Sequence, residues 1–399
     1  MITEVVPSVR SVALGLWVRT GSRDEAPEEA GVSHFLEHLL FKGTERHSAI
    51  EISELFDGMG AATNAATSKE TTHLHARFLD EHTEEAFDLM GEMLLAPSLP
   101  PDEIDSERQV VLEEIAMYED EPSDRVHDVL AEAIHGEHPL GRRVLGHAEV
   151  IASIPVGDIA GYHDGRYTAP NIVVAAAGHL EHERIVGLAA ERLRRAGANG
   201  AGSSNNGGPA EAGTRLLFYP KETEQYHICF GGPGISRADD RRFALGVLDA
   251  VFGGSVSSRL FREVREKRGL AYSVGTSLVS YRGASMTWGY TATKNERVPE
   301  CLAVIEAEIL RLKTDGPSDE ELAKAKDYLT GSYALGFDTS TKIAHQLAQV
   351  AFEGLGIDYI ARRNSLVAAV TQADIARAAE RTLGDGKLLV VVAGRPVGL

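Results

Sequence analysis

The pattern of apolar and polar positions repeats in the same order in the two halves of the chain. Alternating apolar residues indicate strands, and apolar residues that recur every three to four positions indicate helices. The first half predicts strand, helix, helix and strand, at residues 9–22, 28–41, 48–59 and 72–80. The second half predicts the same order, at residues 225–234, 241–254, 257–269 and 283–292. Each half continues with two helical stretches and ends in a β run, at 171–178 and 387–394.

This repeated order predicts two duplicated domains with an α+β fold. Hairpin strands mixed with paired helices favour, in each half, a mainly antiparallel sheet covered by helices on one face. The segment 196–214 is almost wholly Gly, Ala, Ser, Asn and Pro, which is typical of a flexible linker. We therefore expect an N-terminal domain at 1–196, a linker at 197–214 and a C-terminal domain at 215–399.

Composition narrows the possible partners. The 399 residues carry 40 Lys and Arg against 59 Asp and Glu, a net charge of −19 that repels nucleic acid and anionic membranes and attracts basic polypeptides. No stretch reaches the roughly 18 apolar residues of a membrane helix. Cys229 and Cys301 lack the spacing of a metal or redox pair, and we expect buried free thiols. These features predict a soluble cytoplasmic protein without nucleic-acid or membrane partners.

A candidate metal site lies in the helix predicted at 28–41. Three residues, His34, Glu37 and His38, form an H-x-x-E-H pattern and share one arc of the helix, while apolar residues occupy the opposite side. Imidazoles at positions i and i+4 can bind one zinc ion, and the carboxylate between them can polarise a water molecule. A core helix would bury this polar arc at high cost, so we favour the metal site.

A third ligand must come from another element, because a catalytic zinc has three protein ligands and an open position. Glu114 is the best candidate, because it lies in a helical stretch whose apolar residues, Val110 and Met117 among them, we expect to be buried. Glu107 lies two turns earlier on the same face and could orient a ligand. An exposed helix carboxylate is an equally good interpretation of Glu107.

The inverted H-x-x-E-H pattern, followed by Glu114 in a VVLEEI context, resembles the inverzincin peptidases of the pitrilysin/insulinase family. The resemblance covers essentially the whole chain and is closest to the mitochondrial processing peptidase and its bacterial relatives. It implies one zinc ion per chain, held by His34, His38 and Glu114, with Glu37 as general base. It also implies that the usual leading segment is short or absent, because the first strand begins close to Met1.

Three further features gain a role through this resemblance. Asn64, Ala65 and Ala66 would lie on an edge strand that binds the substrate backbone, although a tight turn is the alternative. Arg265 would hold the substrate backbone, and Tyr272 would donate a hydrogen bond to the oxyanion. Without the resemblance, Arg265 is one of several solvated helix charges and Tyr272 is a strand residue.

Two other groups of residues have a simpler interpretation. Leu245, Leu248 and Asp249 stand in the second copy of the helix where the first has its metal motif, so that copy has lost the site. His73 and His75 alternate on a strand and could be a second metal pair, but we favour solvent or helix-packing histidines.

The sequence thus predicts a zinc metalloendopeptidase that hydrolyses short or unfolded peptides inside a closed chamber. The chain has the length of one half-clamshell subunit of the family, so we expect a homodimer or a heterodimer with a related subunit. The main alternative is a catalytically silent scaffold or partner subunit of a processing-peptidase-like complex. A metal-dependent phosphohydrolase is remote, because the chain lacks an aspartate-rich ligand set.

Overall fold

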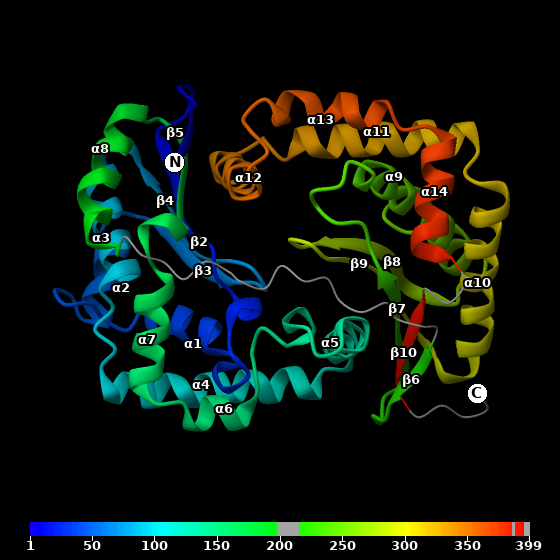
Figure 1. The fold of residues 1–399 in the computed structure, drawn as a ribbon, viewed down its shortest axis with the longest axis horizontal. Helices are drawn as coiled ribbons and strands as arrows, with labels where there is room; N and C mark the ends of the chain where they lie inside the picture. The colour runs from blue at the N-terminus through cyan, green and yellow to red at the C-terminus, as the bar shows by residue number, and fades with distance from the viewer. Residues whose placement is uncertain (198–214, 385–387, 395–399) are drawn as a thin grey trace. The chain divides into compact units, whose positions relative to one another are not determined.

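Two five-stranded sheets organise the chain (Figure 1). The computed structural model describes residues 1–197, 215–384 and 388–394, so the predicted linker at 197–214 lies almost entirely outside the described residues. The strand order is β1-β5-β2-β4-β3 in the first sheet and β6-β10-β7-β9-β8 in the second. In both sheets the first pair of strands is parallel and the other pairs are antiparallel. The predicted α+β class with two duplicated halves is confirmed.

The strands of the two sheets come from corresponding places in the two halves. The first sheet contains β1 Ile2–Val5, β2 Ser11–Val18, β3 Ala62–Thr67, β4 Thr72–Leu79 and β5 Ile172–Gly178. The second contains β6 Arg215–Tyr219, β7 Gln225–Pro233, β8 Ala271–Ser280, β9 Ser285–Lys294 and β10 Leu389–Ala393. In both sheets the last strand in the order, β3 or β8, pairs on one side only and forms an edge.

Helices pack on the first sheet and form its main core. In chain order they are α1 Val32–Leu39, α2 Ala49–Gly58, α3 Thr83–Leu95, α4 Pro101–Asp120, α6 Ala148–Ser153, α7 Val156–Arg166 and α8 His182–Arg192. Leu14 and Leu16 of β2 meet Phe35, Leu36 and Leu39 of α1 in one buried cluster. The helical period thus buries one face of α1, and alternation along β2 directs Leu14 and Leu16 to the side of the sheet that α1 covers.

Each sheet also carries a helix on its other face, which the sequence patterns did not indicate. Helix α12, Ser340–Glu353, packs Leu347 and Ala348 against Trp17 and Val173 of the first sheet. Helix α5, Pro122–His135, packs against β7 and β10 of the second sheet. Each of these helices belongs to the opposite half of the sequence. The remaining helices are α9 Arg242–Phe252, α10 Val298–Asp315, α11 Asp319–Leu335, α13 Tyr359–Ala368 and α14 Gln372–Leu383.

The chain therefore divides into two compact units that are discontinuous in sequence. The first unit is Met1–Ala116, Arg142–Asn205 and Ala334–Ala361. The second is Met117–Gly141, Asn206–Tyr333 and Arg362–Leu399. The boundaries predicted from the linker do not assign α5 to the second unit or α12 to the first. Apolar patterns can show that a strand is buried on both faces, but they do not show which helix covers it.

Two features bear on the predictions from composition. Cys229 and Cys301 are buried free thiols, as the sequence predicted. Among the described residues, no helix combines the length and the apolar character that crossing a bilayer requires.

The start of α1 is fixed by a glycine turn and a buried carboxylate. Gly31 precedes the helix with φ 98° in the left-handed region, where a Cβ atom would lie 2.6 Å from the carbonyl oxygen of Leu145. Glu25 accepts hydrogen bonds from the backbone N–H groups of Gly31, at 2.8 Å, and Ser33, at 2.9 Å. The hydroxyl groups of Ser33 and Tyr162 are also hydrogen-bonded, at 2.9 Å. These contacts set the direction in which α1 leaves the preceding loop.

We expect Gly31→Ala to destabilise the first unit by more than about 1 kcal/mol, because it imposes both backbone strain and a clash. Gly161→Ala in α7 is the matched control, since nothing lies within 4 Å of a Cβ atom at that position. That change should be neutral or stabilise by up to about 1 kcal/mol. Urea unfolding monitored by circular dichroism measures both, and equal midpoints for the two variants would contradict the prediction.

Burial raises the pKa of Glu25 to about 7, although the hydrogen bonds from Gly31 and Ser33 oppose the shift. The pKa of an unperturbed glutamate is near 4.5. Between these two values the folded state holds a proton that the unfolded state has released, so the contribution of Glu25 to stability falls as the pH rises.

The Tm of Glu25→Gln, which stays neutral, should therefore rise relative to that of the wild type as the pH increases from about 5 to about 8. Thermal unfolding at a series of pH values tests this expectation. Glu28→Gln, which changes an exposed carboxylate on the neighbouring turn, is the control and should show no comparable trend. Parallel Tm profiles for wild type and Glu25→Gln would show that the burial of this carboxyl group does not control the pH dependence.

Candidate metal centre

Helices α1 and α4 bring three ligand atoms together in the first unit. The Nε2 atoms of His34 and His38 lie 3.3 Å apart, and each lies 3.5 Å from Oε2 of Glu114. A tetrahedral zinc with ligands at about 2.0–2.1 Å requires ligand atoms roughly 3.4 Å apart. The three side chains therefore already have the spacing of a zinc site, and within the described ranges no other group of three His, Cys, Asp or Glu residues does.

Burial and charge keep His34 in the form that binds metals. Its side chain is 14% exposed, and burial, followed by the charge of His38, lowers its pKa to about 4. A histidine with this pKa is neutral at pH 7 and offers a nitrogen lone pair. The site thus needs no proton loss from His34 before a cation binds.

Glu107 orients the second histidine. It is 7% exposed, so it is not the solvated carboxylate that was the alternative interpretation. Its Oε2 lies 3.1 Å from Nδ1 of His38, and its Oε1 forms an ion pair with Lys42. Because Nδ1 of His38 is directed at Glu107, Nε2 is left to face His34 and Glu114.

The burial of α4 differs in part from the expectation. Val111 and Ile115 are buried, but Val110 is 42% and Met117 67% exposed. The buried positions of the helix, Ile104, Glu107, Val111 and Ile115, follow the three-to-four residue period, and Val110 and Met117 fall outside it. The expectation that Val110 and Met117 are buried is therefore wrong, whereas Glu114 lies at the site as expected.

Glu37 lies on the same face of α1 as the two histidines and is half-buried. Burial raises its pKa, and hydrogen bonds from Thr67 partly oppose that shift. A carboxylate with a raised pKa beside a metal site is suited to accept and return a proton. Since Thr67 is the last residue of β3, its contact also ties Glu37 to the edge strand.

The residues predicted to bind substrate lie within β3, so the tight-turn alternative is wrong. Among the strands of the described residues, β3 pairs with β4 alone, and its other edge has no strand beside it. Ala65 is 5% exposed and packs into the core, whereas Asn64 is exposed and Ala66 half-buried on the opposite face. Ala65 can therefore meet a ligand only through its backbone.

Arg265 and Tyr272 contact each other in the second unit. The guanidinium group of Arg265 lies 4.5 Å from the ring centre of Tyr272 and 4.7 Å from that of Phe261. Arg265 belongs to a π-helical turn, Phe261–Glu266, and a shift in the β8–β9 register between Ala271 and Val274 leaves Tyr272 82% exposed. Irregularities of this kind are frequent at functional sites. The role of the pair stays a prediction.

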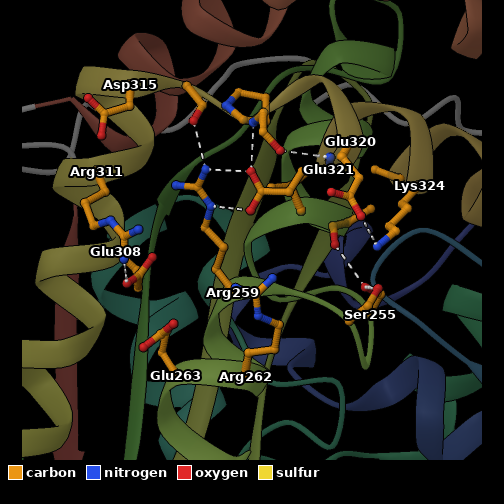
Figure 2. A pocket seen from close by; sticks show the side chains of 17 residues that line it. Ser255, Arg259, Arg262, Glu263, Glu308, Arg311, Asp315, Glu320, Glu321 and Lys324 are labelled. Atoms are coloured by element: carbon orange, nitrogen blue, oxygen red, sulfur yellow. Dashed lines mark hydrogen bonds and ion pairs between the residues drawn. The ribbon is translucent and has the colours of Figure 1, made fainter. Parts of the chain in front are cut away.

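The second unit also holds a charged cavity of about 490 Å³ that the sequence did not indicate (Figure 2). Arg259 forms two 2.8 Å bonds to the carboxylate of Glu321 and a third to the carbonyl oxygen of Gly316. Glu308 pairs with Arg311 at 2.8 Å. These pairs join positive and negative side chains of the lining, so much of the charge in the cavity is already compensated.

Comparisons with known proteins agree with this geometry. The family model "Insulinase (Peptidase family M16)" matches residues 1–148, and the model "Peptidase M16 inactive domain" matches residues 153–329. The chain is 36% identical over 401 residues to an uncharacterized zinc protease of Streptomyces coelicolor, covering 98% of this chain and 87% of the relative. It is 40% identical over 340 residues to the uncharacterized zinc protease YmxG of Bacillus subtilis, covering 85% and 82%.

Solved structures show the same fold at lower identity. A peptidase M16 inactive domain from Pseudomonas fluorescens superposes with a TM-score of 0.92 at 23% identity, over 99% of this chain and 95% of that one. A protease from Helicobacter pylori gives a TM-score of 0.91 at 20% identity, over 98% and 96%. The resemblance that the sequence motifs indicated is thereby confirmed, and the chain belongs to the insulinase family of peptidases, peptidase family M16.

Proposed function

We propose that this protein is a zinc metalloendopeptidase whose zinc is held, one ion per chain, by His34, His38 and Glu114. The observation that carries the proposal is the triangle of ligand atoms, with sides of 3.3 to 3.5 Å. The names of the relatives as zinc proteases support the same metal and reaction class. Zinc at this position supplies a Lewis acid that polarises the scissile carbonyl group and lowers the pKa of a water molecule.

Glu37 acts as the general base. It lies beside the ligands without being one of the triangle, and burial raises its pKa. It takes the proton from the attacking water and returns the proton to the leaving amine of the peptide. Glu107 fixes the ring of His38 and strengthens it as a ligand, while the ion pair with Lys42 keeps Glu107 in place.

The substrate is an extended peptide that adds to the open edge of β3. Backbone N–H and C=O groups of an edge strand pair with any extended chain, so affinity depends little on side chains. The contact between Glu37 and Thr67 at the end of β3 supports this arrangement, because it joins the proposed general base to the same strand. A folded protein offers no free strand of this kind, so we propose short or unfolded peptides as substrates, enclosed in a chamber during cleavage.

Arg265 and Tyr272 are proposed to hold the substrate backbone and the oxyanion. The contact between their side chains and the 82% exposure of Tyr272 support this role, because an exposed phenol is free to donate a hydrogen bond. We further propose a homodimer, with a related subunit as the alternative partner.

Loss of any ligand should abolish zinc binding and peptide cleavage together. His34→Ala, His38→Ala and Glu114→Gln each remove one of three ligands. Glu37→Gln should retain zinc but lower kcat at least about a hundredfold, because it removes the proton acceptor alone. Metal content by mass spectrometry and cleavage of a quenched fluorescent peptide measure the two effects.

Glu113→Gln, an exposed neighbour on α4, is the control and should retain both properties. A wild-type chain that binds zinc but cleaves no unfolded peptide would support the silent-subunit alternative. Normal cleavage by Glu37→Gln would exclude its role as general base.

Mixing two inactive variants tests the assembly. Glu37→Gln and Tyr272→Phe should each be nearly inactive alone. If each active site takes Glu37 from one chain and Tyr272 from its partner, a mixed dimer has one intact site and recovers up to about half of the wild-type activity. Size-exclusion chromatography with light scattering establishes that dimers form. Mixed dimers without activity would mean that one chain supplies both residues or that the partner is a different protein.

A further inference from the structure

A second cavity, of about 390 Å³, lies in the first unit on the face of the sheet opposite α1. Trp17 of β2 and the β4 residues His73, His75 and Arg77 line it on the sheet side. Helix α12 covers β5 and β2 and contributes Lys342, His345 and Gln346 to the lining. The cavity thus forms where α12 no longer covers the outer strands. Neither the sequence patterns nor the proposed zinc chemistry gives it a role.

Trp17 and the histidines form a stacked wall. The indole ring of Trp17 lies over Gly15. A Cβ atom at position 15 would be only 2.0 Å from this ring, so a side chain there would clash with it. The ring of His73 stacks on Trp17 at 5.5 Å and on His75 at 5.3 Å, and His345 approaches His73 at 6.1 Å. The histidines therefore pack against a helix and an aromatic ring, as the sequence predicted, but they also line a cavity.

The lining of this cavity contains no carboxylate, although the chain has a net charge of −19. Arg77 and Lys342 are permanent cations. Lys342 pairs at 2.9 Å with Asp338, which does not line the cavity, and Arg77 forms no ion pair with another described residue. The charged cavity of Figure 2 differs in this respect, because Arg259, Arg311 and Lys324 pair with acidic residues of the same lining. The cavity at α12 therefore has an uncompensated positive charge.

The histidines add hydrogen-bonding capacity. The Nδ1 atoms of His73 and His75 are buried and have no hydrogen-bond partner among the described residues. Burial lowers the pKa of His73 to about 4 and lowers the pKa values of His75 and His345. Neutral imidazoles each offer one N–H donor. The Nδ1 atoms of His73 and His75 are closed off from the cavity, so a hydrogen bond from these two rings to a ligand there would come from Nε2.

We propose that the cavity binds a carboxylate group of the peptide that lies along β3. This rests on the proposed function, because it requires a peptide on that edge. Ala62, the first residue of β3, lines the cavity and pairs in register with Arg77. Side chains of an added strand alternate between the two faces of the sheet, and those on this face pass Ala66, Asn64 and Ala62 of β3, with the cations at the Ala62 end.

The length of β3 sets the position of this carboxylate relative to the cleaved bond. Thr67, which contacts Glu37, and Ala62, which lines the cavity, are the two ends of the strand. Five residues of extended chain span about 17 Å. The carboxylate should therefore belong to a residue about five positions from the scissile bond, and it can be a Glu or Asp side chain or the C-terminus of the peptide.

The test uses the full chain with zinc and a set of unfolded reporter peptides of one length. One set carries a single Glu at successive distances from the cleaved bond, with Gln at that position in the matched peptide. We expect Glu about five residues from the bond to lower KM about tenfold relative to Gln, with no such gain at distant positions. A second pair, with a free or an amidated C-terminus at the same distance, distinguishes the two sources of the carboxylate, and a gain in either pair supports the site.

Arg77→Gln should reduce the ratio of KM values for the Gln and Glu peptides to about one, and Arg77→Lys should keep part of it. Arg184→Gln, an exposed arginine on α8, is the control and should retain the full ratio. Equal KM values for all wild-type pairs, or a ratio that Arg77→Gln leaves unchanged, would overturn the inference while the peptidase function stands.

If the wild type cleaves no peptide, the proposed function fails instead. Fluorescence anisotropy with the labelled Glu and Gln peptides then tests the cavity by itself. Tighter binding of the Glu peptide that depends on Arg77 supports the site, and equal binding excludes it.

Discussion

The hydrogen bond between Glu107 of α4 and His38 of α1 joins the two helices that carry the candidate metal ligands. Helix α1 has eight residues and one polar face, and its rotation is set by Phe35 and Leu36 in the core. The Glu107–His38 contact then fixes α4 against that face and brings Glu114 within 3.5 Å of both histidines. The geometry of the candidate zinc site therefore depends on core packing as much as on the ligands themselves.

The second copy of the domain has the same order of strand and helix but lacks the H-x-x-E-H motif. Helix α9 follows β7 as α1 follows β2, but it has Leu245 and Leu248 buried at 4% and 2% exposure. Asp249 is half-buried, and desolvation raises its pKa to about 6, partly offset by a hydrogen bond from Thr276. Apolar side chains thus occupy two of the three positions that match the H-x-x-E-H residues of α1, and the same architecture forms without the motif.

The exchange of helices between the two halves leaves part of the first sheet uncovered near its edge. Helix α12 comes from the C-terminal half and covers the inner strands of the first sheet, which buries Trp17 and Val173. The outer strands β4 and β3 remain partly uncovered, so one face of the edge borders a cavity and the other borders α1. A peptide on β3 would present alternate side chains to two different environments, and the side chains on the cavity face would meet positive charge in an otherwise acidic protein.

The sequence by itself determined the local structure and the chemistry of the site. The H-x-x-E-H spacing places two imidazoles and a carboxylate on one helix face, and the alternating strands and their repeated order predict two similar α+β halves. Only the tertiary structure decided which distant residues meet. Glu107 could equally have been a surface carboxylate, Val110 and Met117 proved to be exposed, and the coverage of each sheet by a helix from the other half left no local signal. Local patterns record how much of an element is buried, but contacts between elements depend on packing that the pattern of one segment does not contain.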